Sequence, residues 1–206
     1  MKFPIKTIDF ESEGSARKAA GIAIAAAAVI VIAVILFLAG RPVLPSWIVW
    51  QDKAQGVSVG DQMIVHLRGK EVVVTKVAVD NTNPGEIAST IEETLWHSED
   101  GVRVSDYLIG DIDGDSNPEM LLLVWKQGSY GQHRPFWVSE DTAKYTQHIY
   151  IYSIRKDLIK PVWMSSELEM KIKDWSLDKS GHLHITDTDG ISTVWGWVSW
   201  GLMRLD

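Results

Sequence analysis

The 206-residue chain lacks cysteine, and its 20 Lys and Arg residues are outnumbered by 27 Asp and Glu residues. Without cysteine, the chain has neither a disulfide framework nor the attachment residue of a lipoprotein. Its acidic balance disfavours nucleic acid and anionic membrane surfaces as ligands and favours metal cations. The sequence therefore predicts no nucleic-acid partner, and a fold stabilised by an apolar core or a bound ion.

Charge is also missing from one continuous stretch of 22 residues, Ala19–Gly40, which is mostly Ala, Ile, Val and Leu. A helix over this stretch is about 33 Å long, which matches a hydrocarbon core of about 30 Å. The apolar region of a cleaved signal peptide is shorter, about 7 to 15 residues, and ends at a small-x-small site that is poorly matched here. The stretch predicts an uncleaved transmembrane helix over residues 19–40.

Basic residues around this stretch predict its orientation. The four that precede it are Lys2, Lys6, Arg17 and Lys18, and the two that follow closely are Arg41 and Lys53. Because basic residues are retained on the cytoplasmic side, the N-terminus is expected inside and the remainder outside. The expected organisation in the cell membrane is a cytoplasmic tail (1–18), a transmembrane helix (19–40), a linker (41–46) and an extracytoplasmic domain (47–206).

The mean hydropathy of −0.01 conceals two opposed parts. Residues 1–18 hold 4 basic and 3 acidic residues, so 16 basic and 24 acidic residues follow the apolar stretch, a net charge of −8. All 10 tryptophans also lie beyond it. The outer part is thus an acidic, tryptophan-rich domain of about 160 residues, long enough for one sizeable core.

Short apolar or alternating segments separated by turn residues predict an all-β domain. In Gln147–Arg155, for example, Ile149 and Ile151 alternate with aromatic and polar residues, which is the period of a strand. The other predicted strands are Gln62–Leu67, Glu71–Val79, Val102–Ile109, Met120–Lys126, Leu158–Trp163, Met170–Leu177, Leu183–Thr186, Thr193–Val198 and Gly201–Leu205. Glu86–Trp96 is interpreted as the start of a strand, with a short helix as the alternative. This spacing indicates a sandwich, a barrel or a propeller.

Two segments of the domain resemble each other. Leu95–Ser98 is echoed by Val162–Ser165, and Asp106-Tyr107 is echoed by Asp174-Trp175 at nearly the same offset along the chain. Recurrence of a β unit after tens of residues is typical of propellers and β-solenoids.

An Asp-rich segment predicts a metal site. A short loop carries carboxylates at its first, third, fifth and ninth positions, which are Asp111, Asp113, Asp115 and Glu119. The same loop contains Gly114, and Asn117 offers a backbone carbonyl. Hard divalent cations require a ring of oxygen ligands, so Ca²⁺ is the expected ion. The helix-loop-helix calcium motif is excluded, because it requires Gly at position 6 and Glu at position 12, where this chain has Ser116 and Leu122. The alternative is an acidic turn whose carboxylates are solvated.

The segment Gly110–Asp115, with Glu119 and an aliphatic strand after it, resembles the calcium loop of FG-GAP and VCBS-type repeats. Four further segments are similar to a group of bacterial, membrane-anchored FG-GAP-like proteins: His133–Trp137, Gln147–Tyr152, Pro161–Trp163 and Val194–Gly201. The resemblance implies propeller blades joined by a calcium loop. A domain of this length has room for few blades, so the resemblance implies a partial or compact propeller, or one completed by another chain.

Aromatic residues suggest a ligand surface. Trp137, Trp195, Trp197 and Trp200, with Tyr130 and Phe136, would suit a glycan or a protein partner at the cell envelope. The alternative is that most of them fill the core, since a β domain without disulfides uses aromatics for packing. Trp195 and Trp197 are expected on the same face of one strand.

A catalytic motif is not recognisable, so the predicted role is non-catalytic binding or scaffolding. One alternative is an envelope hydrolase that uses His133 with Glu140 and Asp141 as an acid/base site. Another is an accessory subunit of a membrane complex, in which the small residues Gly21, Ala25 and Ala28 pack against a neighbouring helix.

Overall fold

The computed structural model describes residues 27–34, 37, 42–59, 61–80, 89–130, 134–156 and 158–206. The chain divides into two compact units, Met1–Pro42 and Val43–Asp206. In the first unit, residues 27–34 and 37 are helical. Among the described residues, we find no helix with the length and apolar character needed to cross a bilayer. The predicted tail 1–18 and the remainder of the predicted span 19–40 lie outside the described residues.

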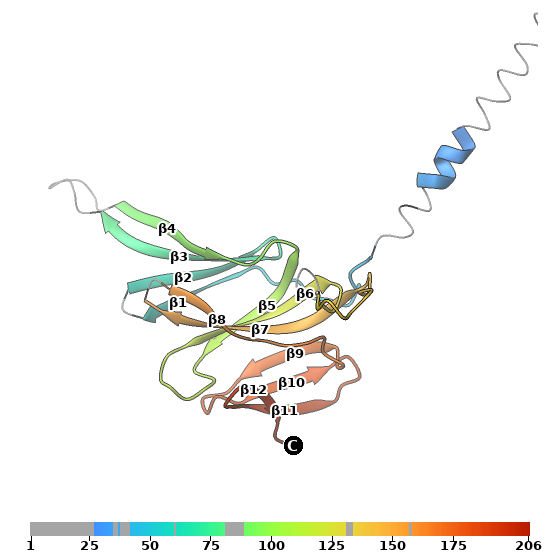
Figure 1. Cartoon of the computed structure of the whole chain (residues 1–206). Helices are drawn as coiled ribbons and strands as arrows, with labels where there is room; N and C mark the ends of the chain where they lie inside the picture. The colour runs from blue at the N-terminus through green and yellow to red at the C-terminus, as the bar shows by residue number, and fades with distance from the viewer. Residues whose placement is uncertain are drawn as a thin grey trace, which may run out of the picture. The chain divides into compact units, whose positions relative to one another are not determined.

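The second unit is all-β, as predicted: its described residues form three four-stranded antiparallel sheets, each a simple meander (Figure 1). The first sheet contains β1 (Lys53–Val59), β2 (Asp61–Arg68), β3 (Glu71–Asp80) and β4 (Ser89–His97). The middle sheet contains β5 (Val102–Gly110), β6 (Glu119–Gln127), β7 (Tyr145–Arg155) and β8 (Leu158–Met164). The third sheet contains β9 (Ile172–Leu177), β10 (Leu183–Asp187), β11 (Ser192–Val198) and β12 (Gly201–Arg204).

The middle sheet is covered on both faces (Figure 1), which explains the nearly continuous apolar sequence of β6. Alternate residues of a strand point to opposite faces. Met120 and Leu122 therefore pack into a core shared with the first sheet, whereas Leu121 and Leu123 pack into a core shared with the third. The domain is a stack of sheets with two apolar cores.

The observed strands agree with the predicted segments, with one omission. β4 runs from Ser89 to His97, so the segment interpreted as a strand or a helix is a strand in its described part. β1, Lys53–Val59, is missing from the predicted strands, because Val57 is its single buried residue and apolar alternation is limited to Val57 and Val59.

The internal repeat occupies equivalent places in the first two sheets. Ser98 follows β4 and Ser165 follows β8, so each lies just after the fourth strand of its sheet. The Ser98 N–H donates to the Val72 carbonyl (2.8 Å) and the Ser98 hydroxyl accepts from the Val72 N–H (3.1 Å). Ser165 makes the same two bonds with Ile149, both at 2.9 Å.

The third sheet ends in a related way. The Leu205 N–H donates to the Val194 carbonyl (2.8 Å), and the Val194 N–H donates to Oδ1 of Asp206 (3.1 Å). Val194 lies on β11, the third strand of its sheet, as Val72 and Ile149 do in theirs. A side-chain oxygen after the fourth strand thus caps the third strand in all three sheets.

Candidate functional site

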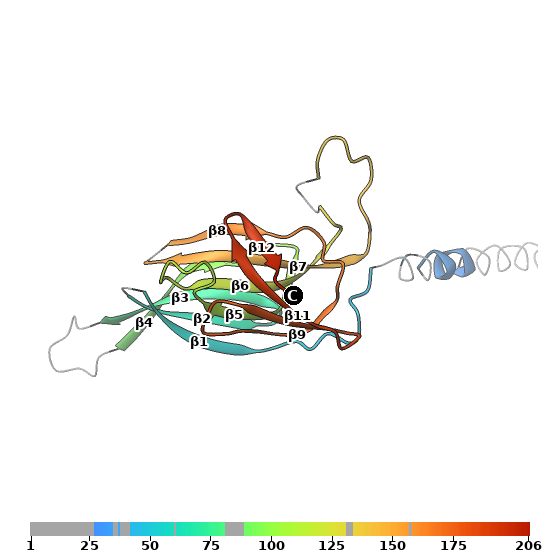
Figure 2. The ribbon, with the colours of Figure 1, turned by 90° about the horizontal axis from the view of Figure 1, so that it is seen from below.

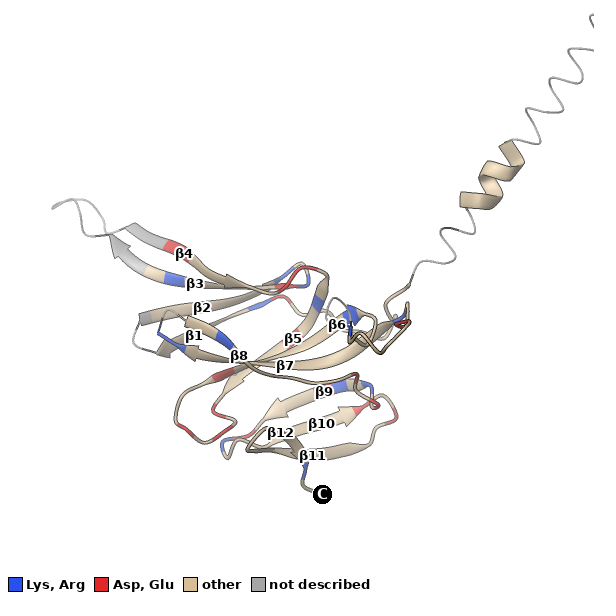
Figure 3. Cartoon of the chain, in the orientation of Figure 1, with Lys and Arg blue, Asp and Glu red and all other residues tan. Residues whose placement is uncertain are grey.

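The predicted metal loop joins β5 to β6. Gly110, the last residue of β5, is paired with Glu119, the first residue of β6, so Asp111–Pro118 forms the connection between them. Acidic residues are concentrated on this loop (Figure 3). Gly114 and Ser116 have positive φ angles of 78° and 70°, which produce the sharp turn. Ser116 thus adopts the backbone conformation that Gly favours.

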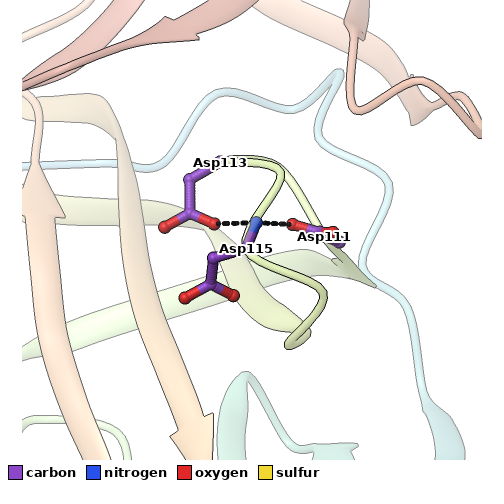
Figure 4. A group of neighbouring side chains, drawn as sticks. All are labelled: Asp111, Asp113 and Asp115. Atoms are coloured by element: carbon purple, nitrogen blue, oxygen red, sulfur yellow. Dashed lines mark hydrogen bonds between the residues drawn. The ribbon is translucent and has the colours of Figure 1, made fainter.

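Three aspartates converge in this loop. Carboxylate oxygens of Asp111, Asp113 and Asp115 lie within 4.8 Å of one another (Figure 4). The Asp111 carboxylate accepts backbone N–H bonds from Gly114 (2.7 Å), Asp115 (3.1 Å) and Ser116 (2.9 Å). The Asp115 N–H also donates to Asp113 (3.1 Å). Hydrogen bonds within the loop therefore fix its backbone in a conformation that holds the three aspartate carboxylates close together.

Asp115 has a cationic neighbour from another part of the chain. Its carboxylate pairs with the side chain of Arg155, the last residue of β7, and accepts two bonds from Asn117. The hydrogen bond from Arg155, followed by those from Asn117, lowers the pKa of Asp115 to about 2. Nothing in the sequence signals the contact with Arg155, which lies 40 residues from Asp115.

Glu119, the fourth predicted carboxylate ligand, is buried, with 1% of its surface exposed, and it is not among the three whose oxygens lie within 4.8 Å of one another. Its Oε2 accepts the N–H of Ile112 (3.2 Å), which directs the side chain into the loop. Among the described residues, its Oε1 has no hydrogen-bond partner. Burial, together with the charges of the three loop aspartates, raises the pKa of Glu119 to about 7 despite the bond from Ile112. A buried, unpaired carboxylate oxygen costs several kcal/mol unless a cation or a proton neutralises it.

The donor set consists of oxygen atoms. Carboxylates are hard ligands that suit Ca²⁺ or Mg²⁺ better than soft transition metals. Asp111 Oδ2, Asp113 Oδ1 and Glu119 Oε2 each accept a single N–H bond, so each keeps a lone pair for a cation. The side-chain amide of Asn117 is bonded to Asp115, and a ligand role for the Asn117 carbonyl stays a prediction.

The turn between β9 and β10 packs against this loop. A Cβ atom placed on Gly181 would lie 2.8 Å from the carbonyl oxygen of Asp111. Asp178, in the same turn, directly follows β9 as Asp111 directly follows β5, so the two aspartates occupy equivalent positions after the first strands of their sheets. It accepts N–H bonds from Ser180 (2.8 Å) and His182 (3.0 Å). The two turns thus occupy equivalent positions in their sheets and are in contact with each other.

The four predicted ligand-binding tryptophans occupy different environments. Trp195 and Trp197 lie on one face of β11 and pack against the core between the middle and third sheets. Trp137, on the β6–β7 loop, is 73% exposed, and Trp200, on the β11–β12 turn, is 81% exposed. The tryptophans are thus divided between core packing and two separate surface positions.

The predicted acid/base cluster is only partly described, because His133 lies outside the described residues. Glu140 is exposed. The Asp141 carboxylate accepts backbone N–H bonds from Ser129 (2.8 Å), Tyr130 (3.0 Å) and Thr142 (2.8 Å). Asp141 therefore ties the two ends of the β6–β7 loop together, which is a structural role.

A cleft of about 410 Å³ lies beside this loop, lined in part by Glu99, Lys126, Tyr130, Asp141 and Tyr150. Burial lowers the pKa of Lys126 and raises that of Tyr150 to about 12. At neutral pH, the cleft presents a tyrosine hydroxyl and a lysine among carboxylates. These groups suit polar contacts with a ligand.

The sequence matches no known protein family, and neither the curated proteins nor the solved structures give a match.

Proposed function

We propose that this protein is anchored in the cell membrane by residues 19–40, with an extracytoplasmic β domain that binds one Ca²⁺ in the Asp111–Glu119 loop. Its role at the envelope is non-catalytic binding or scaffolding. The ion is structural in this proposal: it joins β5 to β6 and supports the contact with the β9–β10 turn, so its binding free energy adds to that of folding.

The observation that carries the calcium proposal is the environment of Glu119. An acidic turn with solvated carboxylates requires no buried acid, yet Glu119, directly after the loop at the start of β6, is buried with Oε1 unpaired within the described part of the chain. A divalent cation would neutralise this oxygen together with the carboxylates of Asp111, Asp113 and Asp115.

The three meanders support a finer description of the fold, a partial propeller built from three blades. Four antiparallel strands per unit are a feature of blades. The cap after the fourth strand recurs in all three sheets, as expected of repeated units. The calcium loop would then join the first two strands of the second blade. Whether another chain completes the ring stays a prediction.

Thermal unfolding of the full chain in detergent tests the calcium proposal. At a Ca²⁺ concentration about a hundredfold above Kd, the midpoint should rise by roughly 5 to 10 °C relative to chelator. Asp113→Asn should abolish this rise, while retaining an oxygen that can accept the Asp115 N–H. Asp189→Asn is the matched control, because Asp189 also lies in an exposed acidic turn, and it should keep the rise. Equal midpoints with Ca²⁺ and with chelator would reject the proposal.

A further inference from the structure

The loop between β6 and β7 presents two aromatic side chains to solvent that contact each other. Phe136 is 94% exposed and Trp137 is 73% exposed. Their rings contact each other edge to face, with centroids 4.8 Å apart and an angle of 82° between the planes. Leaving such rings in water is costly, which points to a partner that covers them.

The base of this loop is held firmly. The Gly128 N–H donates to the Lys144 carbonyl (2.9 Å), and the Thr146 hydroxyl donates to the Gly128 carbonyl (2.9 Å). With the Asp141 bonds described above, these contacts fix the point from which the loop projects. The aromatic pair is therefore presented at a defined end of the domain.

The chain reaches the domain at that same end. Trp47 packs edge to face on Trp125, near the end of β6, with ring centroids 5.5 Å apart. Figures 1 and 2 both show the segment from Val43 and the β6–β7 loop at one end of the sheets. Only Arg41 and Pro42 separate Val43 from Gly40, the last residue of the predicted span, so the Cα atoms of Gly40 and Val43 are at most about 11 Å apart.

The calcium loop lies at the opposite end. In a meander, the β5–β6 and β6–β7 connections leave opposite ends of the sheet. The β9–β10 turn contacts Asp111 through Gly181, and the β11–β12 turn with Trp200 lies at that same end of the third sheet. Trp200 is thus an exposed tryptophan far from the aromatic pair along the strands.

We propose that Phe136 and Trp137 insert into the headgroup region of the bilayer that holds residues 19–40. This inference deepens the proposed function and rests on its membrane anchor. Phe and Trp rings bury apolar surface at this depth, and Trp is enriched at membrane interfaces. The insertion holds the domain with its calcium loop directed away from the membrane. Glu99, Asp100 and Glu167 lie at the same end, so apolar insertion rather than attraction to anionic lipid drives the contact.

The absence of native cysteine permits a direct test. Three full-length single-cysteine variants, Phe136→Cys, Trp200→Cys and Ala28→Cys, are labelled with an environment-sensitive fluorophore and reconstituted into phosphatidylcholine vesicles. Some of the vesicles contain phosphatidylcholine that carries a nitroxide quencher near the headgroup or near the end of the acyl chain. The Ala28 position reports the anchor, and Trp200 is the matched exposed control.

The label at position 136 is expected to be quenched, more strongly by the nitroxide near the headgroup, while the label at position 200 stays unquenched. The label at position 28 is expected to be quenched through its location in the bilayer. Quenching at 28 without quenching at 136 would overturn insertion of the loop and leave the anchor intact. Equal quenching at 136 and 200 would also overturn it, and no quenching at 28 would overturn the anchor and the inference together.

Discussion

The β5–β6 loop and the β9–β10 turn both begin with an aspartate directly after the first strand of a sheet. They differ in the groups that surround these carboxylates. Asp111 is followed by two more aspartates and the buried Glu119, with Arg155 as a basic partner at Asp115. Asp178 has two histidines instead: His184 Nε2 lies 3.0 Å from its carboxylate and His182 Nδ1 lies 3.5 Å away.

In the β9–β10 turn the carboxylate charge is paired by residues of the turn and of β10, whereas in the β5–β6 loop part of the carboxylate charge is not. The hydrogen bond with His184, followed by that from the His182 N–H, lowers the pKa of Asp178 well below its usual range. In the β5–β6 loop, burial and the charges of the neighbouring aspartates raise the pKa of Glu119, whose Oε1 has no hydrogen-bond partner within the described part of the chain. One repeat unit thus forms a self-contained turn, and the other retains an excess charge that a cation would neutralise.

The largest expected effect is on the pH dependence of the free energy of unfolding, and it comes from Glu119 in the absence of metal. Its pKa is about 7 in the folded chain and 4.5 in the unfolded chain, so the unfolded state ionises first. Stability is therefore full below about pH 4.5 and is lost as the pH rises toward 7, by about 2 to 3 kcal/mol between pH 5 and pH 8. Glu119→Gln should remove this loss. Denaturant unfolding with chelator across that range measures it, and equal slopes for the two proteins would show that Glu119 is not the source.

The next largest effect on stability is expected from disrupting the contact between the β5–β6 loop and the β9–β10 turn. Gly181 has a φ of +78° and would place a Cβ atom 2.8 Å from the Asp111 carbonyl, so Gly181→Ala introduces backbone strain and a clash. Gly190 has a φ of +82° with open space around its Cβ position in the described structure, so Gly190→Ala introduces strain alone. We expect Gly181→Ala to unfold more easily than Gly190→Ala by about 1 to 2 kcal/mol. Comparable stabilities would show that the two turns do not support each other.

The smallest effect is expected from substitution of the first aspartate in the second turn. Asp178→Ala removes the acceptor for the N–H groups of Ser180 and His182 at an exposed site. It should lower the melting midpoint slightly and leave the increase caused by Ca²⁺ unchanged. Asp111→Ala, at the equivalent position, should abolish that increase. Loss of the Ca²⁺ effect in both variants would mean that the two turns act as one site.

Local sequence patterns predict much of the fold. Alternation of apolar residues predicts β7, and the spacing of Asp and Gly predicts the β5–β6 loop, because both depend on residues close together in the chain. β1 escapes prediction because its partner strand, rather than its own pattern, determines its conformation. The equivalence of the repeats is visible in the sequence, but their shared hydrogen-bonded caps require the structure.

The features that distinguish the site depend on tertiary contacts, which local sequence patterns do not predict. The sequence places Glu119 at the ninth position of the loop, but its burial depends on the sheets that cover β6. The pairing of Arg155 with Asp115 and the approach of Gly181 to Asp111 join distant residues. The exposure of Trp137 and the partial burial of Trp195 and Trp197 likewise depend on which strand faces are covered.

Calorimetric titration of the full chain with CaCl₂ at pH 7.5 tests the central claim most directly. The account predicts one Ca²⁺ bound per chain with a Kd below about 1 mM. Binding should be lost in Asp113→Asn and kept in Asp189→Asn. Absence of binding to the unsubstituted chain at millimolar Ca²⁺, or unchanged binding to Asp113→Asn, would contradict the assignment of the β5–β6 loop as the metal site.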